Sequence, residues 1–323
     1  MEEAFALRRE GITAPVLSWL NPLDTDFAAA VLAGVDLAVP SSAHLAAVTE
    51  AAARLRRPAR VHLFVDVGMA REGVPWQEWP AFCRQARAAE RSNVQVVAVM
   101  GHLSSADRPD SEQHRAELRR FRTAVATARQ TRLRFRLVHL ATTAALFSDP
   151  ETHFDLVRAG AGLYGIDPVG SGAVRGAMSL TAPVVGTRDV PAGTGVGYGH
   201  THVTRTATRL ALVPLGYADG VPRAASGRAQ VLVRGRRCPV VGSVSMDQVV
   251  VDVGELDVQT GETVTFFGPG DLGEPTIADW ARWAGTIPNE IVTGIGGRVL
   301  RAQAPAPAVA LPGPVALPVG GVA

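Results

Sequence analysis

Short apolar runs alternate with amphipathic helical patterns from residue 2 to about residue 166, and this alternation limits the possible folds more than any other feature of the sequence. The apolar runs lie at residues 14–19, 35–40, 60–68, 94–103, 134–141 and 154–166. The helix candidates lie between them, at residues 25–33, 43–56, 76–90, 111–130 and 141–147. Runs rich in Val and Leu that are separated by helices are typical of parallel strands buried on both faces. The first half of the chain is therefore predicted to be a (β/α) barrel or an open doubly wound sheet.

Two features favour the barrel over the open sheet. No Gly-x-Gly-x-x-Gly motif, the marker of dinucleotide-binding sheets, follows the first apolar run. Polar residues collect at the carboxyl ends of the runs, where barrels build their active sites; these residues are Asp66, Arg71, His102, His139, Thr142, Thr143 and Arg158. Six strands are two fewer than a closed barrel has, and residues 1–8 resemble the middle of an amphipathic helix. We therefore expect an incomplete TIM-like α/β barrel, without its first βα unit and its second strand.

The pattern changes at about residue 177. Short Val- and Thr-rich runs separated by glycine turns replace the alternation, which predicts a mostly antiparallel β domain with one short helix at residues 276–284. Residues 302–323 are uncharged and rich in Ala, Pro and Gly, and we expect a disordered tail there. The predicted organisation is a partial barrel at residues 1–170, a β domain at 171–301 and the tail at 302–323.

The composition excludes several classes of function. A net charge of +2 without a clustered basic face gives no reason to expect a nucleic-acid partner. Cys83 and Cys238 lack the paired spacing of a zinc site or a disulfide framework, so we expect no metal. No secretory signal opens the chain, and no membrane helix is expected along it, which favours a cytoplasmic protein. All 32 basic residues are arginines, so a lysine Schiff base cannot form within these 323 residues.

Eight short segments carry a more specific signal. They are VDVGMAREG at 65–73, GHLSSAD at 101–107, HLATTAA at 139–145, FDLVRAGAGLYG at 154–165, GTGVGYG at 193–199, PLGYADG at 214–220, GSVSMDQ at 242–248 and GTIPNEI at 285–291. In this order, and after a predicted barrel, the segments resemble alanine racemase over residues 2–301. The resemblance implies pyridoxal 5′-phosphate (PLP) as cofactor and the interconversion of L- and D-alanine. It also implies a homodimer with shared active sites and a small amino acid as substrate.

The resemblance assigns roles to eight residues. Tyr198 matches the catalytic tyrosine, His102 the histidine that supports the tyrosine, and Arg158 the arginine that meets the pyridine nitrogen of the cofactor. Arginine can only donate hydrogen bonds and stays charged, so such an arginine keeps that nitrogen unprotonated. The remaining positions are matched by Thr143, Gly160 and Ala161 for the cofactor phosphate, and by Arg71 and Met246 for the substrate.

Three departures from the family pattern set the alternatives. The cofactor lysine of the family lies on the first barrel strand, and no lysine is present here. Phe64 stands where many relatives have a lysine that orients the arginine matched by Arg71, and Asn289 stands where the family usually has a phosphate-binding tyrosine. Our first hypothesis is an alanine racemase whose start is wrongly assigned or which is given as a fragment, and which is active once a lysine-bearing N-terminal segment is restored. The alternatives are a lysine-less, non-racemising relative and a PLP-dependent amino-acid decarboxylase of related architecture.

Overall fold

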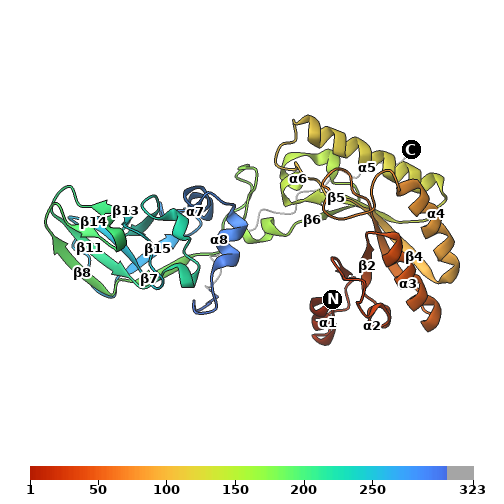
Figure 1. Cartoon of the computed structure of the whole chain (residues 1–323), viewed down its shortest axis with the longest axis horizontal. Coiled ribbons are helices and arrows are strands. Elements are labelled where there is room, and N and C mark those ends of the chain that lie inside the picture. Colours follow the sequence, from red (N-terminus) through yellow and green to blue (C-terminus); the bar gives the residue numbers. More distant parts are fainter. Residues whose placement is uncertain (304–323) are drawn as a thin grey trace, which may run out of the picture. The chain divides into compact units, whose positions relative to one another are not determined.

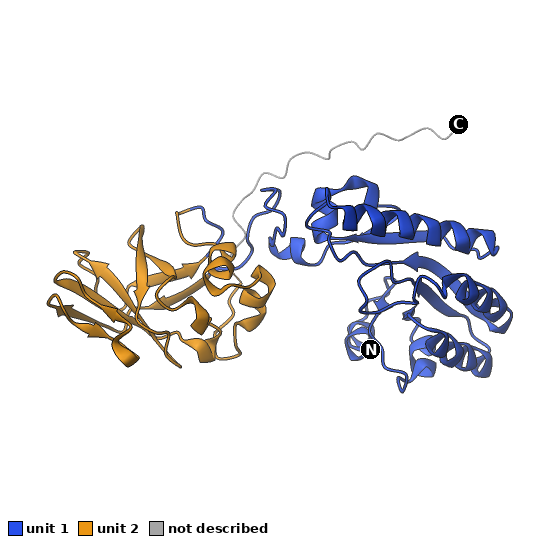
Figure 2. Ribbon diagram, turned by 45° about the horizontal axis from the view of Figure 1, so that its top comes forward, with its two compact units in different colours: residues 1–179, 268–271 blue, residues 180–267, 272–323 orange. Residues whose placement is uncertain are grey.

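The computed structural model describes residues 1–303, and the chain divides into two compact units (Figure 2). Unit 1 comprises Met1–Ser179 with Gly268–Asp271, and unit 2 comprises Leu180–Phe267 and the chain from Leu272 onward. From residue 304 on, the tail predicted for residues 302–323 lies outside the described residues.

Unit 1 is built on a curled sheet of six parallel strands in the order β1-β2-β3-β4-β5-β6, as the strand and helix alternation predicts (Figure 1). The strands are β1 (Leu17–Ser18), β2 (Asp36–Val39), β3 (Ala59–Phe64), β4 (Val94–Met100), β5 (Leu137–Thr142) and β6 (Leu156–Arg158). The helices are α1 (Glu2–Arg9), α2 (Phe27–Leu32), α3 (Ser42–Leu55), α4 (Trp79–Ala89), α5 (Glu112–Gln130) and α6 (Thr143–Ser148). Three short 3₁₀ helices complete the unit: η1 (Glu90–Ser92), η2 (Pro150–Thr152) and η3 (Ala161–Tyr164).

The main hydrophobic core of unit 1 lies between the sheet and the helices. Helix α5 begins at the Ser111 cap, whose hydroxyl accepts from the His114 amide, and it buries an apolar stripe that includes Phe121. The buried Trp79 of α4 donates its indole N–H to the Ala124 carbonyl of α5 over 2.9 Å. Full burial of one such aromatic side chain contributes about 2 kcal/mol. The helices thus cover one face of the sheet. The polar residues described below lie on the other face.

Strand alternation decides which residues reach that other face. Val61 and Leu63 of β3 pack with the helices, whereas Phe64 belongs to a separate buried cluster with Ala38 and Met100. Successive side chains of a strand point to opposite faces, so His62 lies on the same face as Phe64. By the same alternation, Asp36 of β2 and His139 of β5 lie beside core residues Leu37, Val138 and Leu140 and therefore face the side of the sheet that the helices do not cover.

Unit 2 contains a seven-stranded sheet in the order β7-β15-β12-β13-β14-β11-β8, with antiparallel pairing throughout. Its strands are β7 (Leu180–Pro183), β8 (Gly186–Val190), β11 (Thr208–Val213), β12 (Gln230–Val233), β13 (Arg236–Val241), β14 (Val249–Gly254) and β15 (Thr263–Phe267). Strands β9 (Gly195–Val196) and β10 (His202–Val203) form a separate antiparallel pair. The 3₁₀ helices are η4 (Tyr198–His200), η5 (Tyr217–Asp219) and η6 (Arg223–Ala225). The prediction of an antiparallel β domain after the α/β unit is confirmed.

Two α-helices accompany the sheet of unit 2. Helix α7 (Ile277–Ala284) matches the helix predicted at 276–284 and begins at a capping box formed by Thr276 and Asp279. Helix α8 (Pro288–Gly294) was not predicted, because its seven residues are too few for a helical period to stand out. Its proline occupies the first helical position, where a missing N–H costs nothing. Among residues 1–303, no helix is both long and apolar enough to cross a membrane.

Candidate active site

Arg158 lies at the centre of the polar cluster in unit 1, at the carboxyl end of β6. Its Nη1 donates to His139 Nδ1 over 2.8 Å, and its Nη2 donates to the Gly101 and Leu140 carbonyls over 2.8 and 3.0 Å. The guanidinium also lies over the Trp19 ring, 5.4 Å from the centroid. Three backbone and side-chain acceptors from neighbouring strands therefore hold one edge of this guanidinium in place.

The charges of this cluster follow from burial. Burial lowers the pKa of Arg158 to about 10, which still leaves a cation at neutral pH. Burial, together with the charges of Arg158 and Arg71, lowers the pKa of His102 to about 4. Burial and the neighbouring Arg158 and His62 lower the pKa of His139 to about 3. Both imidazoles are therefore neutral at neutral pH and can accept hydrogen bonds from the arginine.

One atom of Arg158 has no partner. Its Nε is buried and makes no hydrogen bond within the described residues. A buried donor without an acceptor costs about 1–3 kcal/mol, so this position is suited to a ligand that brings an acceptor. An unprotonated pyridine nitrogen is such an acceptor, and the donor set of Arg158 therefore fits the ring of pyridoxal phosphate.

A second group of predicted residues gathers beside β6. Thr143, the first residue of α6, is buried, and its hydroxyl accepts from the Gly162 amide over 3.1 Å. Gly160 and Ala161 lie in the same loop as Gly162, and a Cβ on Gly160 would have open space around it for 4 Å. The structure thus brings Thr143, Gly160 and Ala161 to one place, near the end of the strand that carries Arg158.

The loop that carries Arg71 is held in two ways. The Asp66 carboxylate accepts from the backbone amides of Gly68, Met69 and Ala70 over 2.9, 2.9 and 3.0 Å. Glu72, next to Arg71, accepts from the Trp19 indole N–H over 2.5 Å, and burial raises the pKa of its carboxyl group. The Asp66 carboxylate thus holds the backbone immediately before Arg71, and these hydrogen bonds do not involve residue 64.

Phe64 is buried and packs edge-to-face against Trp19, with ring centroids 5.2 Å apart. Trp19 also meets the His102 ring at 5.7 Å, so an aromatic cluster occupies the space around residue 64. The sequence indicates only that a polar group is missing at this position. In the structure, the ring of Trp19 fills the space beside Phe64, and the sequence alone did not predict this role of Trp19.

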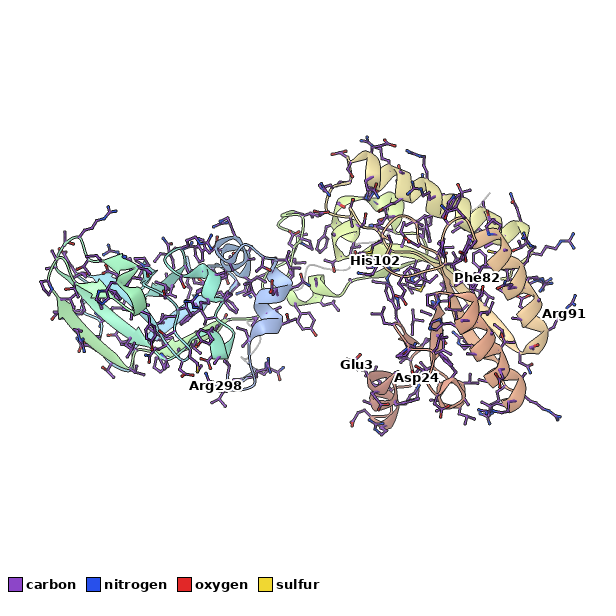
Figure 3. The ribbon with its side chains drawn as sticks, viewed as in Figure 1. Glu3, Asp24, Phe82, Arg91, His102 and Arg298 are labelled. Atoms are coloured by element: carbon purple, nitrogen blue, oxygen red, sulfur yellow. The ribbon has the colours of Figure 1, made fainter. Side chains whose placement is uncertain are left out.

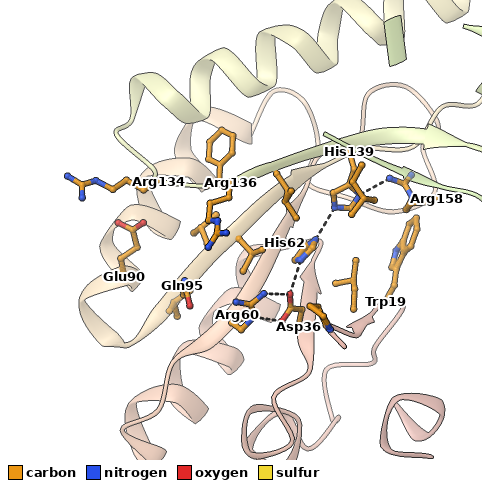
Figure 4. A pocket seen from close by; sticks show the side chains of 18 of the residues that line it. Trp19, Asp36, Arg60, His62, Glu90, Gln95, Arg134, Arg136, His139 and Arg158 are labelled. Atoms are coloured by element: carbon orange, nitrogen blue, oxygen red, sulfur yellow. Dashed lines mark hydrogen bonds and ion pairs between the residues drawn. The ribbon is translucent and has the colours of Figure 1, made fainter. Parts of the chain in front are cut away.

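Two further residues that sequence analysis missed line the same region. His62 Nδ1 lies 2.9 Å from His139 Nε2, and His62 Nε2 lies 3.2 Å from Asp36 Oδ2. Figure 4 shows these side chains beside a cavity of about 1110 Å³ that Trp19, Arg60 and Arg158 also line. The signal in the sequence is a charged or imidazole side chain inside an apolar strand, as in VDLAVP at 35–40 and RVHLFVDVG at 60–68. Such residues are rarely buried without a specific partner.

In unit 2, three of the motif segments meet. The Tyr217 amide donates to the Ser245 carbonyl over 3.0 Å, and the Ala218 amide donates to the Met246 carbonyl over 2.9 Å. A Cβ on Gly242, which has a φ of +72°, would lie 2.8 Å from the Val196 carbonyl oxygen. The segment at 242–248 therefore packs through its backbone against both the segment at 193–199 and the segment at 214–220.

The predicted residues of unit 2 stand on the surface of this assembly. Tyr198 is 79% exposed and Met246 is 54% exposed. Arg298, labelled in Figure 3, supports the assembly by pairing with Asp219 over 2.9 Å and with Asp247 over 2.7 Å. His102, labelled in the same figure, belongs to unit 1 with the other predicted residues. The two exposed side chains are available for contact with a ligand or a second chain.

Comparisons with known proteins agree over both units. The family models for the N-terminal and C-terminal domains of alanine racemase match residues 1–168 and 177–303. An alanine racemase of Frankia casuarinae is 47% identical over an alignment of 308 residues that covers 93% of this chain and 80% of that protein. The structure of alanine racemase from D-cycloserine-producing Streptomyces lavendulae aligns with a TM-score of 0.87 at 41% identity, covering 92% of this chain and 80% of that one. Alanine racemase from Bartonella henselae with covalently bound pyridoxal phosphate aligns with a TM-score of 0.82 at 26% identity, covering 92% and 81%.

Proposed function

We propose a function from the premise that the chain belongs to the alanine racemase family. The activity is the PLP-dependent interconversion of L- and D-alanine. The observation that carries this proposal is the buried, unpartnered Nε of Arg158 at the carboxyl end of a parallel strand. Neither a decarboxylase nor a non-racemising relative is favoured by relatives that are 41–47% identical over most of the chain.

Pyridoxal phosphate, when bound, supplies a conjugated ring that stabilises negative charge at the α-carbon of an amino acid. Arg158 would hold the ring, because its buried Nε is a donor without a partner that suits the pyridine nitrogen. Because arginine cannot transfer this proton at neutral pH, Arg158 would leave the pyridine nitrogen unprotonated.

Thr143, Gly160 and Ala161 would hold the phosphate of the cofactor. The Thr143 hydroxyl already accepts from the Gly162 amide, which leaves its own proton for a phosphate oxygen. Backbone amides of the glycine-rich loop can approach closely because Gly160 carries no side chain. Arg71 and the Met246 amide bind the substrate carboxylate, a group that charged and backbone donors recognise.

Racemisation needs two acid–base groups on opposite faces of the α-carbon. Tyr198 supplies one of them, holding and releasing a proton at its phenolic oxygen, and the family resemblance assigns His102 a supporting role for this tyrosine in the proposed homodimer. The other group is an amine in this family, and none of the 323 residues is a lysine that could supply it. The exposure of Tyr198 and Met246 supports a homodimer in which each protomer completes the active site of its partner.

The test uses proton exchange, because a single acid–base group suffices for it. The 323-residue chain with pyridoxal phosphate should exchange the α-proton of one alanine enantiomer for deuterium in D₂O, followed by proton NMR. Tyr198→Phe should abolish this exchange, and the matched control Tyr164→Phe should leave it unchanged. Exchange that survives Tyr198→Phe, or equal exchange of both enantiomers, would exclude the assigned role of Tyr198.

A further inference from the structure

Four side chains from four strands form one continuous chain of contacts across the face of the sheet that the helices do not cover (Figure 4). Arg158 of β6 contacts His139 of β5 over 2.8 Å, and His139 contacts His62 of β3 over 2.9 Å. His62 in turn contacts Asp36 of β2 over 3.2 Å. The aspartate and both histidines are at least 96% buried. Polar groups buried to this extent are nearly always hydrogen-bonded, and here the partners are the other members of the chain.

The two ends of this chain determine the proton positions within it. Arg158 can only donate, so His139 Nδ1 must accept and the proton of this neutral imidazole lies on Nε2. His139 Nε2–H therefore donates to His62 Nδ1, which places the proton of His62 on its own Nε2. That proton is donated to Asp36, whose ionised carboxylate can only accept. Every bond thus runs in one direction, from the arginine to the aspartate.

Asp36 is itself fixed from the other side. Arg60 donates from Nε to Oδ1 over 2.5 Å and from Nη2 to Oδ2 over 3.0 Å. Burial alone would raise the pKa of the Asp36 carboxyl group, but the hydrogen bonds from His62 and Arg60 outweigh burial and lower the pKa. The carboxylate therefore remains a charged acceptor with a fixed orientation.

We propose that Asp36 and His62 are positioning residues that act through His139 on Arg158 and so fix the direction in which its Nε points. The proposal rests on the function inferred above. Within the described residues, His139 is the partner of Arg158 Nη1. If His139 carried its proton on Nδ1, two N–H donors would face each other and the guanidinium would turn away. The acceptor at Asp36 excludes this tautomer, although it lies two side chains from the arginine.

The experiment combines two measurements on the full chain. Imidazole ¹⁵N NMR reads the tautomer of each histidine, and titration with pyridoxine 5′-phosphate, which needs no lysine amine, reads binding to the ring site. His62→Leu removes both hydrogen bonds, whereas His62→Gln keeps one acceptor and one donor. The matched control is Asp149→Asn, which alters the carboxylate that contacts His114 over 2.7 Å elsewhere in unit 1.

In the unaltered chain, we expect both His62 and His139 to carry their proton on Nε2. His62→Leu should weaken pyridoxine 5′-phosphate binding about tenfold, the effect of losing one hydrogen bond at the ring nitrogen. His62→Gln should restore most of the affinity, and Asp149→Asn should leave it unchanged. A proton on His139 Nδ1, or equal affinity of the His62→Leu variant, would overturn the positioning role alone. Failure of the unaltered chain to bind the probe would overturn the proposed function as well.

Discussion

Gly216→Ala gives a direct test of how the motif segments of unit 2 are held together. A Cβ at residue 216 would lie 2.5 Å from the Met246 carbonyl carbon and would also collide with the Ser245 and Met246 carbonyl oxygens. Ordinary van der Waals contact begins at 3.4 Å, so the loop at 242–248 must move by about 1 Å. Because the atoms it meets are backbone, no side-chain rotation can relieve the overlap. Overpacking of this kind costs about 1–3 kcal/mol.

Urea unfolding of the full chain should therefore show a free energy of unfolding about 1–3 kcal/mol lower for Gly216→Ala. Gly186→Ala is the matched control, because it makes the same chemical change in the same unit with nothing within 4 Å of the new Cβ. The control should be neutral or slightly stabilising, since alanine reduces the entropy of the unfolded chain. Equal stability of the two variants would refute the close packing inferred between residue 216 and the Met246 loop.

Two further predictions concern unit 1. His102 and His139 have pKa values near 4 and 3, below the ordinary 6.5, so the unfolded chain binds protons that the folded chain does not. The free energy of unfolding should thus fall as pH is lowered from about 6.5 towards 4, and urea midpoints measured at each pH will show this. The decline should be shallower in His139→Gln, and an equally steep decline in that variant would contradict the contribution assigned to His139. Asp66→Ala frees three backbone amides of the Arg71 loop and should raise the alanine concentration needed for half-maximal α-proton exchange about tenfold, with little change in the maximal rate. A loss confined to the maximal rate would argue against a role in substrate binding.

Much of the fold could be predicted because its signals are local. Strands and helices repeat with different periods, and each of the six parallel strands overlaps a run identified by its apolar residues, with β3 and β5 extending one residue beyond theirs. Helix α7 was predicted from its pattern, whereas the seven-residue α8 offered too few turns. The first and last residues of the elements were less predictable, since β1 comprises only Leu17–Ser18 of the apolar run at 14–19. Strand ends depend on which backbone groups find a partner, and this is decided by the neighbouring strand.

The residues of the candidate site also fall into those that a local signal predicts and those that it does not. Arg158, His102 and Thr143 were predicted because they fall in segments with a recognisable order along the chain. Asp36 and His62 were not predicted, because nothing in their immediate neighbours shows that they meet. The sequence indicates a polar residue inside an apolar strand, but it does not indicate the partner of that residue.

By itself, the sequence determined the order of the elements, the change from an α/β to a β unit near residue 177, and the absence of a lysine amine among the 323 residues. Tertiary structure alone decided that Asp36, His62 and His139 form one chain of contacts. Asp36 and His62 are 26 positions apart in the sequence, and His62 and His139 are 77 positions apart. The physical reason is register. Contacts across parallel strands depend on how each strand aligns with the next, and this alignment shifts between Val61 and His62 and again beyond His139. Such shifts arise from packing of the whole sheet, and no local pattern encodes them.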